Sequence, residues 1–208
     1  MTTTIPLRSG EETLSATLYG ELPARRAAIL VHGRDWDASG WLDLAPRFAE
    51  SGVPALALDL RGHGRSTGTT DDFVQGQPWS PVADLAAAKT YLREHGVREI
   101  ALVGASLGGH AVVASSWDRD NECLVSISSP VVAVPDELSG RVHGRKLYVC
   151  AQQDRAGAFP HVLASFAALA EPKTLVAFGG TAHSRHMFDQ PYGRDMLELI
   201  LGFVAKGL

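Results

Sequence analysis

The chain has 208 residues, of which 45% are hydrophobic and 20% are charged, and its mean hydropathy is +0.01. This composition is ordinary for a globular protein and argues against disordered, collagen-like and coiled-coil proteins. Nineteen basic and 23 acidic residues give a formal net charge of -4, spread along the chain, so nothing indicates a surface that binds nucleic acid.

Short β-branched runs alternate with longer helical patterns along the chain. This alternation predicts βαβ units and a mostly parallel sheet, in one α/β domain that spans residues 1–208. Residues Thr3–Leu22 alternate weakly around a turn and predict an antiparallel hairpin at the sheet edge. Ala27–Val31 and Val53–Leu60 predict buried strands, with a helix over Trp41–Glu50 between them.

The next segment, Arg61–Ser80, is polar and rich in glycine, and it predicts a loop. Ser80-Pro81 is typical of a helix start, and we expect that helix to end at His95-Gly96. The remaining strands are predicted over Glu99–Val103, Cys123–Ile127, Lys146–Ala151 and Thr174–Phe178, and the remaining helices over Leu107–Ser116, Phe159–Ala170 and Tyr192–Ala205.

The pattern G-x-S-x-G occurs twice, around Ser66 and around Ser106. A nucleophile elbow needs a strand before the serine and a helix after it, so that the hydroxyl stands exposed at the end of the sheet. Ser106 has both neighbours, in IALVGA and LGGHAVVAS, whereas Ser66 leads into GTTDDF with no helix start. The sequence therefore predicts a nucleophile at Ser106 and an ordinary loop residue at Ser66.

A serine nucleophile needs a base and an acid that orients the base. Asp154 follows the strand Lys146–Ala151, and His183 follows the strand Thr174–Phe178. Sites in open α/β sheets lie at the carboxyl ends of strands, so all three side chains are predicted at one edge. The chain order is Ser, Asp, His, which is the order found with this elbow.

These motifs, together with His32-Gly33-Arg34 and the run DLRGHGRS from Asp59, resemble the α/β-hydrolase superfamily over almost the whole chain. The likeness is to lid-less esterases and dienelactone hydrolases. It implies a sheet of about eight strands with helices on both faces and no cap domain. It also implies an oxyanion hole formed by the backbone N–H groups of Arg34 and Leu107.

Two neighbours of these motifs leave alternatives open. The Arg34 side chain could pair with Asp35 or Asp37, bind an anionic group of a substrate, or lie solvated at the surface. His186 competes with His183 as the base, but the spacing from Gly180 to His183 resembles the family pattern, so we expect His186 at the rim.

Only about fifteen residues separate Pro130 from Lys146, where relatives often carry a helical cap, so we expect an open cleft without a lid. Four side chains are candidates to line the substrate site. They are Trp36, Phe159, His186 and Met187. Trp41 and Trp79 are further aromatic candidates, although such residues mostly pack in cores.

The sequence predicts neither a cofactor nor a metal. No H-E-x-x-H or C-x-x-C occurs, and no G-x-G-x-x-G opens a helix after a strand. No apolar run reaches the length of a membrane span, and the first residues lack the pattern of a signal peptide, so we expect a cytoplasmic protein. Cys123 and Cys150 are expected as reduced, buried thiols.

The sequence thus predicts a serine hydrolase that cleaves a small to medium carboxylic ester or thioester through an acyl-enzyme. Two alternatives stay open. One is a binding protein without catalysis on the same fold. The other is a different reaction on that fold, such as perhydrolysis, acyl transfer or carbon-carbon bond hydrolysis. The natural substrate and the oligomeric state are not indicated.

Overall fold

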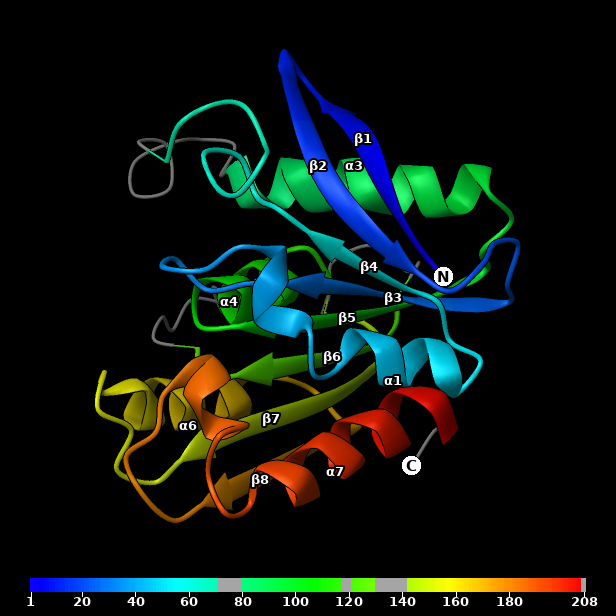
Figure 1. The fold of residues 1–208 in the computed structure, drawn as a ribbon. Helices are drawn as coiled ribbons and strands as arrows, with labels where there is room; N and C mark the ends of the chain where they lie inside the picture. Colours follow the sequence, from blue (N-terminus) through cyan, green and yellow to red (C-terminus); the bar gives the residue numbers. More distant parts are fainter. Residues whose placement is uncertain (71–79, 117–120, 130–141, 207–208) are drawn as a thin grey trace.

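In the computed structural model, the described residues are 1–70, 80–116, 121–129 and 142–206. Their central feature is an eight-stranded sheet in the order β1-β2-β4-β3-β5-β6-β7-β8 (Figure 1). The strands are β1 (Thr2–Ser9), β2 (Glu12–Tyr19), β3 (Arg26–Val31), β4 (Ala55–Leu58), β5 (Glu99–Ala105), β6 (Asn121–Ile127), β7 (Arg145–Ala151) and β8 (Lys173–Phe178).

The predicted hairpin forms one edge of this sheet. β1 pairs with β2, and β2 pairs with β4, both antiparallel, whereas every pair from β4 to β8 is parallel. The carboxyl ends of the parallel strands therefore meet at one edge of the sheet, where the loops that follow β5, β7 and β8 begin.

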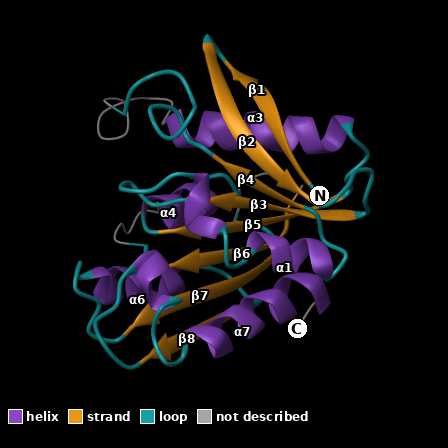
Figure 2. Cartoon of the chain, viewed as in Figure 1, coloured by secondary structure: helices purple, strands orange, loops and turns teal. Residues whose placement is uncertain are grey.

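Helices cover both faces of the sheet (Figure 2). The helices are α1 (Ala45–Glu50), α3 (Ser80–Glu94), α4 (Leu107–Ala114), α6 (Ala158–Ala168) and α7 (Gly193–Lys206). α3, α4 and α6 supply residues to one buried cluster, and α1 and α7 supply residues to the other. Alternate residues of β3 enter opposite clusters, with Ile29 in the first and Leu30 in the second, as the two-residue period of a strand requires. Both faces of the sheet are thus buried, which explains the continuous apolar runs.

The segment predicted as one helix over Trp41–Glu50 is divided in the structure. A 3-10 turn, η1 (Ala38–Trp41), comes first, and α1 starts only at Ala45, with proline in its first turn. Asp37 caps η1 by accepting a hydrogen bond from the Ser39 N–H at 2.8 Å. η1 and α1 both place apolar side chains in the same buried cluster. The apolar spacing of the two elements therefore resembles that of a single helix, which is what periodicity alone predicts.

The described residues contain no cap domain, while residues 130–141, which fall in the segment where relatives carry a cap, lie outside the described residues. None of the helices in the described part of the chain has the length and apolarity that a membrane crossing requires.

Candidate active site

Ser106 stands at a sharp turn between β5 and α4. Its backbone has φ 54° and ψ -118°, a conformation that residues with side chains rarely adopt. The turn is fixed on both sides, because the Ser106 N–H donates to the Ile127 carbonyl at 2.8 Å and the Ser106 carbonyl accepts from the His110 N–H at 3.1 Å. The serine is held at the apex between strand and helix, as the sequence predicts.

Two glycines allow this turn to be so tight. A Cβ atom on Gly104 would lie 2.1 Å from the carbonyl oxygen of Gly108, and a Cβ on Gly108 would lie 2.1 Å from the carbonyl oxygen of Val31. No side chain fits at such distances. α4 therefore passes against β5 and β3 at backbone contact, which is the physical reason for the glycines in the motif.

His183 bridges the other two predicted residues. Its Nε2 atom lies 3.0 Å from Oγ of Ser106, and its Nδ1 atom lies 2.9 Å from both carboxylate oxygens of Asp154. An ionised carboxylate only accepts hydrogen bonds, so Nδ1 carries the proton and Nε2 of the neutral ring is left to accept from the serine hydroxyl. The structure brings Ser106, His183 and Asp154 into one hydrogen-bonded chain.

The Asp154 carboxylate has no exposed side-chain surface. Burial raises the pKa of this carboxyl, but the hydrogen bond from His183, the charge on that ring and the hydrogen bond from the Ala156 N–H outweigh burial and hold the pKa below its ordinary value. The Ala156 N–H donates to Oδ1 at 2.8 Å. Asp154 is therefore an anion beside His183 across the neutral pH range, able to orient the ring and stabilise a positive charge on it.

The loops that carry the acid and the base are joined by backbone hydrogen bonds. The Gln152 N–H donates to Phe178 at 2.8 Å, the Gln153 N–H to Gly180 at 3.1 Å and the Arg155 N–H to Thr181 at 2.9 Å. The Gln153 side chain accepts from the Gly180 N–H at 3.1 Å. The sequence analysis did not predict these hydrogen bonds between the two loops. Gln153, next to Asp154, is the residue in the sequence that could have indicated them.

The segment after β3 carries Arg34, one of the two candidate residues of the oxyanion hole, to the same edge. Gly33 packs against the elbow, since a Cβ on it would lie 3.2 Å from Cβ of Ser106. His32 fixes this segment, because its Nε2 accepts from the Leu60 N–H at 3.1 Å and its Nδ1 lies 2.7 Å from the Gly33 carbonyl. Burial lowers the pKa of His32 to about 4, so this ring is neutral.

The run from Asp59 to Ser66 holds the fold behind the site. Buried Asp59 accepts from the Ala38 N–H at 2.7 Å and from the Arg65 N–H at 3.1 Å. Arg61 pairs with buried Asp84 of α3 at 2.7 Å. The Ser66 hydroxyl accepts from the Ser15 N–H at 2.9 Å and donates to the Asp59 carbonyl at 2.6 Å. The serine of this G-x-S-x-G pattern is therefore a structural residue.

The four candidate substrate residues lie in different surroundings. Trp36 is half-buried beside His186, with ring centroids 5.9 Å apart, and beside Arg185, whose guanidinium lies 5.3 Å from the Trp36 ring. His186 is half-buried, and its Nδ1 lies 3.7 Å from Oδ2 of Asp189. Phe159 is half-buried against the cluster that includes α3 and α4.

Met187 is a correction, because it is fully buried in the other cluster and offers no surface at the rim. It ends the 3-10 turn η2 (Ser184–Met187), and its apolar side chain turns inward with that element. Trp41 is also buried, and Trp79 lies outside the described residues. The Arg34 side chain is exposed and forms no ion pair with Asp35 or Asp37 within the described ranges.

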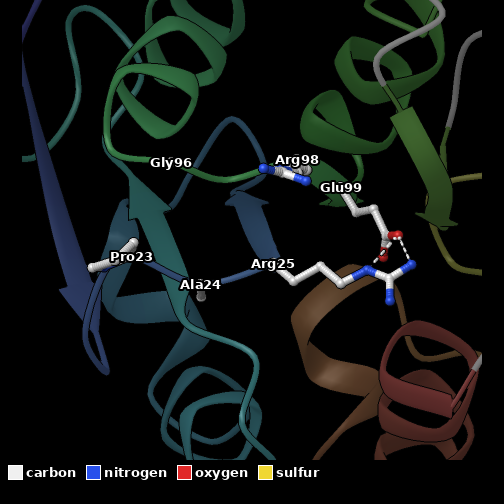
Figure 3. Close-up of a pocket in the computed structure, with 6 residues that line it drawn as sticks. All are labelled: Pro23, Ala24, Arg25, Gly96, Arg98 and Glu99. Carbon is white, nitrogen blue, oxygen red and sulfur yellow. Dashed lines mark hydrogen bonds and ion pairs between the residues drawn. The ribbon is translucent and has the colours of Figure 1, made fainter.

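Two cavities differ in their relation to Ser106. A small one of about 10 Å³ adjoins the elbow and is lined by Trp36, Trp41, Gly33, Ala105 and their neighbours. A larger one of about 530 Å³ lies at the amino ends of β3 and β5, the opposite end of β5 from the elbow (Figure 3). There Glu99 is paired with Arg25 at 2.8 Å. None of the residues that line this cavity belongs to the candidate site. In the part of the chain that the structure describes, no cluster of His, Cys, Asp and Glu is arranged to hold a metal ion.

Comparisons with known proteins identify the fold and the family of the chain. A family model described as "Serine aminopeptidase, S33" matches residues 23–182. A predicted CIB-like hydrolase from Thermoplasma acidophilum superposes with a TM-score of 0.83 at 16% identity, covering 99% of each chain. An esterase from Pyrococcus furiosus gives 0.81 at 15% identity, covering 99% of this chain and 91% of its own.

A dienelactone hydrolase from Anabaena variabilis has a TM-score of 0.75 at 17% identity, and the match covers 99% of this chain and 95% of that one. At such identities the solved structures establish the fold, and the family model, which spans most of the chain, establishes the family. The chain belongs to the serine aminopeptidase S33 family of the α/β-hydrolase superfamily.

Proposed function

We propose that this protein is a serine hydrolase, a single α/β-hydrolase domain that cleaves a carboxylic ester or thioester of a small to medium acyl group. The observation that carries the proposal is the hydrogen-bonded chain from Ser106 through His183 to Asp154, with distances of 3.0 and 2.9 Å. The fold likeness to proteins described as an esterase and a dienelactone hydrolase supports the choice of an ester substrate.

The first half of the reaction forms an acyl-enzyme. Oγ of Ser106 bonds to the acyl carbon while its proton passes to Nε2 of His183, and Asp154 stabilises the resulting imidazolium. The tetrahedral oxyanion receives hydrogen bonds from the Leu107 and Arg34 N–H groups. Leu107 is the first residue of α4, so its amide also has the positive end of the helix dipole behind it. Each such donor contributes about 3 kcal/mol to transition-state stabilisation.

The second half releases the acid. The proton on His183 passes to the departing alcohol or thiol as the bond from the acyl carbon to the leaving group breaks. Water then gives a proton to Nε2 and bonds to the acyl carbon, and the bond to Ser106 breaks as the serine takes the proton back. No atom outside the triad, the two amides, the substrate and water is required.

A panel of 4-nitrophenyl esters and acyl thioesters of graded chain length, together with an amino-acyl 4-nitroanilide, tests the proposal. We expect the wild-type protein to hydrolyse at least one ester or thioester and Ser106→Ala to hydrolyse none above background. Turnover of the anilide alone would favour a peptidase. No turnover by folded protein, with measurable binding of an ester, would favour the reading as a binding protein.

A further inference from the structure

His63 lies in the loop that follows β4, and its ring reaches across to the segment that follows β3. Its Nε2 atom lies 2.7 Å from the carbonyl oxygen of Arg34, and its Nδ1 atom lies 3.0 Å from the carbonyl oxygen of Arg61. A carbonyl oxygen only accepts hydrogen bonds, so a ring nitrogen bonds to it only when that nitrogen carries a proton. The shorter contact assigns a proton to Nε2, so His63 donates to the Arg34 carbonyl.

The turn that carries His63 is itself held in place. The His63 N–H donates to the Leu60 carbonyl at 3.0 Å, and the His63 carbonyl accepts from the Ser66 N–H at 2.9 Å. Gly64, the next residue, has φ 53°, and a Cβ atom on it would collide with the buried carboxylate of Asp59. The ring of His63 is therefore presented from a backbone that has little freedom to move.

The two peptide units on either side of the Arg34 Cα atom each accept a hydrogen bond from a histidine. In the first unit, the Gly33 carbonyl accepts from the Trp36 N–H at 3.1 Å and lies 2.7 Å from Nδ1 of His32. Because the neutral His32 ring accepts a hydrogen bond at Nε2, its Nδ1 carries the proton and donates to Gly33. In the second unit, the one hydrogen bond that the Arg34 carbonyl receives within the described residues comes from His63.

These contacts set the orientation of the Arg34 N–H. In a planar trans peptide the N–H points away from the carbonyl, so the bonds to the Gly33 carbonyl direct the Arg34 N–H. The bond from His63 fixes the following peptide, which limits rotation of the chain about the Arg34 Cα atom. This matters for the nucleophile, because Gly33 packs against Ser106, with 3.2 Å between an added Cβ and the Ser106 Cβ.

We propose that His63 is a positioning residue that holds Arg34 in the orientation in which its N–H stabilises the oxyanion. The inference rests on the proposed function, in which the Arg34 N–H is one of the two oxyanion donors. His63 acts through its Nε2–H, since a bond from Nδ1 to the Arg61 carbonyl joins residues only two positions apart and stays within one turn.

Substitutions of His63 separate the two ring nitrogens. The amide nitrogen of His63→Gln lies near the position of Nε2 and can donate to the Arg34 carbonyl, whereas that of His63→Asn lies near Nδ1 and can donate only to Arg61. His63→Ala removes both donors. His95→Asn is the matched control, because Nδ1 of exposed His95 also lies near a backbone carbonyl, 2.8 Å from that of Tyr91, at the end of α3.

The measurements are kcat and KM on the best ester, the melting temperature, and the inhibition constant of a trifluoromethyl ketone. Oγ of Ser106 bonds to the carbonyl carbon of this ketone while the serine proton passes to His183, which leaves a tetrahedral oxyanion in the site. The inhibition constant therefore reports on the oxyanion donors, which a purely structural role of His63 would not affect.

We expect His63→Asn and His63→Ala to lose about tenfold in kcat and in affinity for the ketone, at unchanged KM, because one oxyanion donor is no longer held in place. His63→Gln and His95→Asn should remain close to wild type in both. Wild-type kcat in His63→Asn would overturn the proposal, as would an equal loss in His63→Gln or melting temperatures of the Asn and Ala variants far below that of His95→Asn. An inactive wild-type protein would instead refute the proposed function itself.

Discussion

Nε2 of His183 lies 3.0 Å from Oγ of Ser106, although 77 residues separate them in the chain. The distance is set by three parallel strands, β5, β7 and β8, which end at the same edge, and by the hydrogen bonds that join the loops after β7 and β8. A serine and an imidazole in this relation form the starting geometry for proton transfer. The predictions below follow from this geometry and from the contacts that maintain it.

Asp154→Asn tests the acid. An asparagine amide would offer a donor to Nδ1 of His183 and favour the tautomer in which Nε2 carries the proton, which cannot accept from Ser106. We expect kcat on the best ester to fall by about 10³-fold or more, with KM little changed. Asp195→Asn, at an exposed carboxylate of α7, is the control and should retain full activity. Equal activity of the two variants would contradict the assignment.

Ser66→Ala tests the serine of the other G-x-S-x-G pattern, which we assign a structural role. The substitution removes the acceptor for the Ser15 N–H and the donor to the Asp59 carbonyl. We expect the free energy of unfolding, measured with urea, to fall by about 1–2 kcal/mol while kcat stays near the wild-type value. Loss of activity without loss of stability would mean that Ser66 takes part in catalysis.

Gly108→Ala tests the close approach of α4 to the sheet. The new methyl would lie 2.1 Å from the Val31 carbonyl oxygen, which belongs to the backbone of a central strand and cannot move aside. We expect a loss of roughly 3 kcal/mol or more in unfolding free energy, or failure to fold. Gly179→Ala is the control, because no atom lies within 4 Å of its added Cβ and its φ is unremarkable. Similar stabilities for both variants would refute the packing argument.

His32 makes stability depend on pH. Its folded pKa is about 4, well below the ordinary 6.5, because burial disfavours the charged ring. The unfolded chain therefore binds this proton first, so the stability present above pH 6.5 is lost as the pH falls toward 4. Between pH 7.5 and 5 this loss is roughly 2 kcal/mol. We expect urea unfolding of His32→Gln to show a pH-dependent loss smaller by that amount, and an equal loss would contradict the assignment.

The two cysteines provide a test of burial at the site. Cys123 and Cys150 are fully buried, and burial raises the pKa of each thiol to about 12. Since the thiolate is the reactive form, we expect iodoacetamide at pH 7.5 to leave the native protein unmodified and to add two groups after unfolding. Intact mass spectrometry measures both. Rapid labelling of Cys150 in the native state would mean that the region behind Asp154 is open to solvent.

The sequence predicted the fold, and it predicted that Ser106, Asp154 and His183 lie together, because both depend on local patterns. Strand ends, a strand-turn-helix and the order of Ser106, Asp154 and His183 are all readable along the chain. The division of the segment Trp41–Glu50 was not readable, since η1 is held by distant Asp59 through the Ala38 N–H. The left-handed backbone of Ser128 was also not readable, because it has no sequence signature.

The rim of the site was the hardest part to predict. Met187 and Trp36 are similar candidates in sequence, yet one is fully buried and the other half-buried beside His186. Met187 lies in the short 3-10 turn η2, and the inward direction of its side chain depends on how that turn packs, which the sequence pattern does not show.

The central claim is that Ser106 is an activated nucleophile. The most direct measurement is labelling of the purified protein with a fluorophosphonate probe, followed by intact mass and peptide mapping, for wild type, Ser66→Ala and Ser106→Ala. We predict one adduct, on Ser106, in the wild-type and Ser66→Ala proteins, and none in Ser106→Ala. No adduct on folded wild-type protein, or an adduct that persists in Ser106→Ala, would contradict the account.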